Sequence, residues 1–311
     1  MMILIPQLFT ETLHDRDPLG RDPHGDEAAG RVLTDLPTLS QHARRADSPF
    51  FRPTRFLSTH EWESLAAVQA FCREIAAIAD AQTTSAWKQA ALSNWRAEMA
   101  RLFAGDPRRP ISQALVAPID RHHLRCEDFL AIIEGTAMEV HGDMRAPHDA
   151  ELDFWMQRGS VAVAHLALNI AGTSAQAAKR IAAELGRALA LTDILLGLAD
   201  DAVHQRLYLP RELLRANGIY ATLPSAVLAD PVLPAICREL ALRADRHYVA
   251  AHAALNDYSS AKLRAAAFVL HTQRAMLRTL VARDWRRLGE PVDVSSKYEA
   301  MLLLRLSLFG Q

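Results

Sequence analysis

Cysteine is scarce in this sequence. The three cysteines lie far apart, form no CxxC pair and, being odd in number, cannot all be paired within one chain: Cys72, Cys126 and Cys237. A disulfide framework is therefore disfavoured, and we expect a reducing, cytoplasmic setting.

An excess of charge of one sign is lacking as well. The chain has 35 basic and 36 acidic residues, so its composition gives no reason to expect the phosphate-neutralising surface of a nucleic-acid-binding protein. Nucleic acid is disfavoured as a partner.

Long hydrophobic runs are missing too. The longest apolar stretch, residues 161–171 (VAVAHLALNIA), is too short to span a bilayer and carries His165 and Asn169. The opening MMILIPQLF has no basic residue before its apolar stretch and is not typical of a signal peptide. We expect no transmembrane helix, and peripheral contact with a membrane stays open.

Strand-like alternation of apolar and polar residues is absent, as are the GxSxG, HExxH, P-loop and strand-preceded GxGxxG motifs. Instead, apolar residues recur at three- and four-residue spacing, and alanine and leucine are abundant, which predicts an all-α chain. Half of the 311 residues are hydrophobic, enough for the core of one large helical domain.

The predicted domain begins after an arm that is rich in Asp, Pro, Gly, Arg and His. We expect a flexible N-terminal arm over residues 1–47 and a helical domain over residues 48–311. Ser58 and Glu61 have the spacing of a capping box, which predicts a helix from there to about residue 81. Further helices are predicted at 85–104, 111–123, 126–141, 149–171, 174–205, 210–217, 231–257, 260–288 and 295–309.

The most specific pattern lies between residues 185 and 219, which read LGRALALTDILLGLADDAVHQRLYLPRELLRANGI. This run resembles the second motif of the squalene/phytoene synthases, in which an aspartate motif of the form NxxRDxxED precedes an arginine and YLP. Asp200, Asp201, Arg206 and the segment Tyr208–Pro210 match that motif in order and spacing.

A second match lies upstream, where Phe71–Arg73 resembles the start of the family motif FCRxxDDxxDE. The resemblance extends over about residues 48–309. It implies an isoprenoid synthase-type helical bundle around a central cavity.

The resemblance also implies magnesium chemistry. Family members condense two prenyl diphosphates head to head, and Mg²⁺ ions bridge the diphosphate to carboxylates on two facing helices. Carboxylates four residues apart share one helix face, so a DxxxD pair on each helix can hold the metal. Here Ala76 and Ala77 replace acids before Asp80, and Gly197 replaces the acid before Asp201.

Further family positions have changed. Leu196 replaces an arginine that contacts diphosphate, and the side chains of Ser160–Ala164 should narrow the prenyl cavity. The remaining candidates form two groups. The candidates to bind a diphosphate or to line the cavity are Arg73, Arg206 and Tyr208. The candidates to bind metal ions, in a degenerate site, are Asp80, Asp200 and Asp201.

A structural role is the alternative that we favour for these candidates. Arg73 can pair with Asp80 or Asp201 in place of a metal ion. Tyr208 and Arg206 can fix the turn into the predicted helix at 210–217. The histidines get the same interpretation: His122 lies near a helix end, where cations favour the dipole, and His165 reads as a core histidine.

Two functions follow from the resemblance. The first is a catalytically inactive binding or assembly protein for an isoprenoid or a protein partner, similar to a phytoene synthase-like assembly factor of respiratory complex I. The second is a Mg²⁺-dependent prenyltransferase that condenses farnesyl or geranylgeranyl diphosphate in squalene, hopanoid or carotenoid biosynthesis. A different chemistry in the apolar cavity ranks last, because no nucleophile–base pair is evident.

Overall fold

The computed structural model describes residues 56–258 and 261–309, so the predicted arm lies outside the described residues. Within these ranges every regular element is helical, and one isolated bridge joins Arg145 to Leu207. The predicted all-α class is confirmed. No helix in the described part of the chain is both long and apolar enough to cross a membrane.

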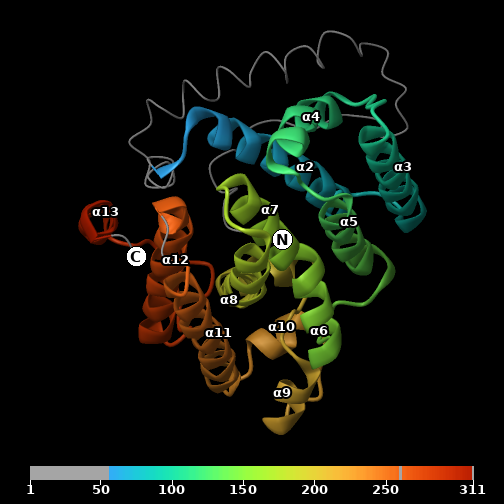
Figure 1. Ribbon diagram of the computed structural model, residues 1–311. Coiled ribbons are helices and arrows are strands. Elements are labelled where there is room, and N and C mark those ends of the chain that lie inside the picture. Colours follow the sequence, from blue (N-terminus) through green and yellow to red (C-terminus); the bar gives the residue numbers. More distant parts are fainter. Residues whose placement is uncertain (1–55, 259–260, 310–311) are drawn as a thin grey trace.

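The helices fall into three groups along the chain (Figure 1). The first group contains α2 (Thr59–Asp80), α3 (Ser85–Phe103), α4 (Pro110–His122) and α5 (Cys126–His141). The second contains α6 (Asp149–Met156), the π-helical turn η3 (Gln157–Val161), α7 (Ala162–Ile170) and α8 (Ala175–Val203). The third contains α9 (Arg211–Ala216), α10 (Pro224–Leu228), α11 (Leu233–Asn256), the 3-10 turn η4 (Ala261–Leu263), α12 (Arg264–Arg283) and α13 (Ser296–Phe309).

The first apolar core lies among α2 to α5. Phe71 of α2 is fully buried and meets the rings of Trp95 and Phe129 edge to face, with centroids 5.5 and 5.3 Å apart. Such edge-to-face contacts are a favourable arrangement of aromatic rings. This core therefore fixes α2, α3 and α5 relative to one another.

The second core is built around α8. Thr192 of α8 and Tyr248 of α11 share a buried hydrogen bond of 2.9 Å between their hydroxyl groups. Residues of α7 belong to both cores: Leu166 packs with the first and Leu168 with the second. In Figure 1, α7 and α8 accordingly lie between the α2–α5 group and the α11–α12 group.

Two features differ from the predicted helices. The predicted helix at 149–171 is interrupted by η3, and α10 was not predicted. Gly186 of α8 packs against η3 so closely that an added Cβ would lie 2.5 Å from the Cα of Val161. Only glycine permits this approach of backbone to backbone.

Candidate functional site

The end of α2 and the end of α8 meet at a cleft of about 470 Å³. Lys88 of α3, Glu139 of α5 and loop residues at 81–83, 142–144 and 204–206 complete its lining. Its charged lining includes Asp80, Lys88, Glu139 and Arg206. The motif residues that lie far apart in the sequence therefore reach one place through the packing of α2, α5 and α8.

Arg206 organises this cleft. Its guanidinium lies 2.7 Å from a carboxylate oxygen of Asp80 and donates to the carbonyl oxygen of Ala79 at 3.3 Å. A carboxylate oxygen of Glu139 lies 3.8 Å from the same group. The Arg206 side chain is only 14% exposed whereas that of Asp80 is 47% exposed, so this contact joins the ends of α2 and α8 at the edge of the buried region.

A largely buried cluster of three polar side chains lies next to Arg206: Glu139 of α5, Trp155 of α6 and Tyr208 of the segment between α8 and α9. The indole nitrogen of Trp155 donates to Glu139 at 2.9 Å, and the Tyr208 ring stacks on Trp155 with centroids 4.8 Å apart. Burial raises the pKa of Tyr208 well above its usual value, so the hydroxyl stays protonated. That hydroxyl has no hydrogen-bond partner among the described residues.

The two adjacent aspartates of α8 differ in environment. Asp201 is 4% exposed, and burial raises its pKa to about 7, with the charges of Glu139 and Asp200 adding to the effect. One oxygen of Asp201 has no hydrogen-bond partner among the described residues. Asp200 is exposed, and its backbone carbonyl accepts from the His204 ring at 2.9 Å.

Lys88 brings a second cation into the cleft. Its ammonium group donates to the carbonyl oxygen of Ala79 at 2.6 Å. Burial and the neighbouring Arg206 charge lower its pKa. Thr84 caps α3 directly after the turn from α2, which places Lys88 one turn into α3, beside the end of α2.

The predicted candidates are thus divided by the structure. Asp80 and Arg206 line the cleft, while Asp201 and Tyr208 are buried. Asp80 pairs with Arg206 and not with Arg73, which occupies an exposed position of α2. The sequence interpretation missed a further set of cleft or neighbouring residues: Lys88, Glu139 and Trp155.

The donor set does not fit a magnesium cluster. Mg²⁺ prefers ionised carboxylates together with water, in octahedral geometry. Asp80 already binds a guanidinium, and Asp201 is buried and does not line the cleft. Among the described residues no group of three or more His, Cys, Asp or Glu side chains is arranged to hold a metal ion.

The sequence comparisons place the chain in a family. The squalene/phytoene synthase family model matches residues 43–297. Presqualene diphosphate synthase of Zymomonas mobilis is 36% identical over 264 residues, which cover 84% of this chain and 89% of that protein. The corresponding protein of Rhodopseudomonas palustris is 34% identical over 261 residues, covering 84% and 93%. The chain therefore belongs to the squalene/phytoene synthase family.

Solved structures share the fold. A dehydrosqualene synthase superimposes with a TM-score of 0.73 at 20% identity, covering 90% of this chain and 98% of that one. Squalene synthase HpnC from Alicyclobacillus acidocaldarius gives a TM-score of 0.70 at 21% identity, covering 83% and 98%. The predicted isoprenoid synthase-type bundle is confirmed.

Proposed function

We propose that this chain binds a prenyl diphosphate in the cleft at the ends of α2 and α8 and does not condense it by the magnesium-dependent route. Membership of the family supports the choice of ligand, since two relatives are named presqualene diphosphate synthases. The cleft supplies Lys88 and Arg206 for the diphosphate oxygens. Charge-assisted hydrogen bonds from such groups are among the stronger ones in proteins.

The ion pair between Asp80 and Arg206 carries the second half of the proposal. It places a guanidinium on the carboxylate that a metal ion would need. Ala76, four residues earlier on α2, offers no second ligand on that face of the helix. On α8 Gly197 likewise leaves Asp201 without its partner acid.

The charge balance of the cleft favours binding of a prenyl diphosphate and does not favour loss of its diphosphate group. Condensation requires strong stabilisation of the negative charge that develops on the departing diphosphate. Lys88 and Arg206 lie beside Asp80 and Glu139, so their positive charge is largely balanced. This arrangement can orient a bound diphosphate but supplies little extra stabilisation for its departure.

A head-to-head prenyltransferase is the second candidate, and the comparisons favour it over the non-catalytic function. The relatives at 34–36% identity are named as synthases, and neither name supports an assembly role. For this function Mg²⁺ would be the cofactor, and Asp80, Asp200 and Asp201 would have to supply its ligands.

Calorimetric titration of the whole chain with farnesyl diphosphate tests the proposal. We expect equal affinity in EDTA and in Mg²⁺, and about tenfold weaker binding for Lys88→Gln. Lys297→Gln, an exposed lysine on α13, is the matched control and should bind like the unmodified chain. Binding that requires Mg²⁺, or that is unaffected by Lys88→Gln, would overturn it.

A further inference from the structure

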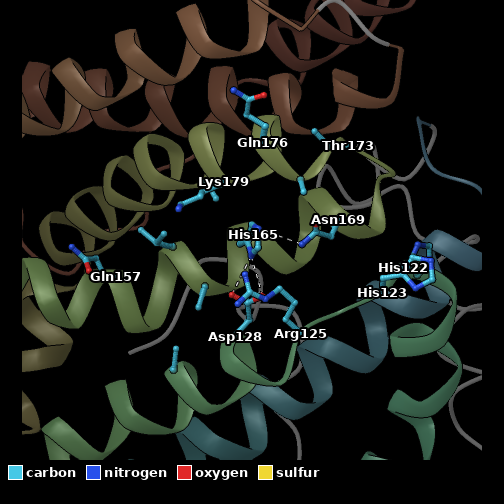
Figure 2. Close-up of a pocket in the computed structure, with 15 residues that line it drawn as sticks. His122, His123, Arg125, Asp128, Gln157, His165, Asn169, Thr173, Gln176 and Lys179 are labelled. Atoms are coloured by element: carbon cyan, nitrogen blue, oxygen red, sulfur yellow. Dashed lines mark hydrogen bonds and ion pairs between the residues drawn. The ribbon is translucent and has the colours of Figure 1, made fainter. Parts of the chain in front are cut away.

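A second cleft, of about 670 Å³, opens on another part of the molecule (Figure 2). Its walls come from the end of α4, the start of α5, one face of η3 and α7, and the start of α8. It shares no lining residue with the cleft at the ends of α2 and α8. A ligand of this second cleft would therefore occupy a different site from the proposed prenyl diphosphate.

The charged lining of the second cleft is mainly basic. Arg125 and Lys179 contribute permanent cations, and Asp128 is the carboxylate in the lining. Arg125 lies 3.2 Å from Glu127, but both side chains are well exposed, and such surface pairs are weak. No ion pair to Lys179 is found within the described ranges. Both cations can therefore turn toward a bound anion.

His165 lies in the middle of this cleft in Figure 2, between Asp128 and Asn169. Its Nδ1 lies 3.0 and 3.1 Å from the two oxygens of Asp128, which can only accept when ionised, so Nδ1 carries the proton. Nε2 faces the Asn169 amide at a long 3.5 Å. The predicted core histidine is thus held by Asp128, and its unprotonated Nε2 borders the cleft as an acceptor that faces the Asn169 amide.

Small apolar side chains form part of the cleft wall, beside polar ones that include Gln157 and Gln176. Ala131 of α5, Ala162 of α7 and Ala182 of α8 contribute methyl groups, and Val161 adds an isopropyl group. The volume lies within the range of ligand pockets in proteins. A basic rim above an apolar wall suits a ligand with one anionic end and one aliphatic end.

We propose that this second cleft binds a small amphiphilic oxyanion, such as an alkyl phosphate. The anionic group contacts Arg125 and Lys179, and the aliphatic part lies on the alanines of α5, α7 and α8. One carboxylate in the lining, already occupied by His165, opposes the ligand only weakly.

Calorimetric titration of the full chain with hexyl phosphate at physiological ionic strength tests this site. We expect saturable binding that weakens about tenfold or more in the double variant Arg125→Gln with Lys179→Gln. The control Arg286→Gln, an exposed arginine outside both clefts, should leave the affinity unchanged. Ala131→Leu should weaken the binding of hexyl phosphate, because the larger side chain fills the space beside the apolar wall. It should barely affect the binding of inorganic phosphate. Circular dichroism confirms that each variant is folded.

Control ligands and the Lys88 variant show which part of the ligand and which cleft account for any binding. Hexanol should not bind, and inorganic phosphate should bind more weakly than hexyl phosphate, because both ends of the ligand contribute. Binding that is lost in Lys88→Gln but kept in the double variant would assign hexyl phosphate to the other cleft and overturn the proposal. Absence of binding to the unmodified chain would also overturn it.

Discussion

Arg206 and Asp80 form one ion pair, but the two residues differ in how much each contributes to the stability of the folded chain. Arg206 is 14% exposed and also approaches the mostly buried Glu139, whereas the Asp80 side chain is 47% exposed. Removing the arginine leaves a buried acid without its nearest guanidinium, and breaking such buried pairs is costly. Removing the aspartate leaves an arginine that still has other acceptors.

Arg206→Met should therefore lower the free energy of unfolding by about 3 kcal/mol. Asp80→Asn should cost less than about 1 kcal/mol, because half of that side chain is already in water. Urea denaturation at neutral pH measures both values. Equal losses in the two variants would show that the pair, and not the wider contacts of Arg206, provides the stability.

Asp201 makes the free energy of unfolding fall as the pH rises. Because burial raises its pKa to about 7, folding is penalised once the unfolded chain ionises this group. The penalty is absent below the unfolded pKa of about 4, grows as the pH rises toward 7 and is constant above.

Asp201→Asn removes this titration. Its gain in unfolding free energy over the parent chain should grow by roughly 1.4 kcal/mol per pH unit between pH 4 and 7 and then level off. Thermal or urea denaturation over that range measures it. A gain that falls with rising pH would mean that the native site stabilises the ionised carboxylate.

At the scale of elements, helix positions could be predicted well because local signals mark their ends. Ser58, Thr84 and Ser174 accept a hydrogen bond from a backbone amide in the first turn of α2, α3 and α8, as expected for N-cap residues. The short α10 was missed, and η3 depends on packing against Gly186 of α8, which no local pattern reveals.

The candidate site could be predicted only in part for the same reason. Asp80 and Arg206 belong to two motifs, and the family resemblance brings them together. Glu139 and Trp155 have no motif of their own; they meet because α5 and α6 pack beside the end of α8. The partner of Asp80 depended on this packing too, since Arg206, and not Arg73, reaches it.

Restoring the missing acids tests whether their loss explains the site. Ala76→Asp with Gly197→Asp recreates a four-residue acidic pair on α2 and on α8. We expect millimolar Mg²⁺ to raise the melting temperature of this double variant and not that of the parent chain, because a ligand that binds only the folded state stabilises it. The matched control is Ala76→Asn with Gly197→Asn. An equal Mg²⁺ effect on the parent would show that the native residues already hold the ion.

The last helix, α13, seals the second core. Leu302 and Leu306 are buried against it, while Met301 and Leu304 of the same helix are exposed. Deleting residues 295–311 should uncover this core and give insoluble protein, as judged by sedimentation after expression. A soluble chain with an unchanged helical spectrum would instead show that α13 is dispensable for folding.

For the whole molecule, the family fold is retained, while Ala76, Ala77 and Gly197 stand where the family motifs have acids. Fold alone does not decide function, which depends on the residues at the ends of α2 and α8. There a guanidinium and an ammonium group lie among the remaining acids. A cytoplasmic location, a protein partner and peripheral membrane contact stay predictions from the sequence.

Turnover of farnesyl diphosphate is the most direct test of the central claim. The folded full-length chain would be incubated with farnesyl diphosphate and Mg²⁺, with released diphosphate and prenyl products both measured. From the proposed function we expect neither diphosphate release nor presqualene diphosphate above the protein-free control. Sustained formation of presqualene diphosphate would contradict it and establish the head-to-head prenyltransferase.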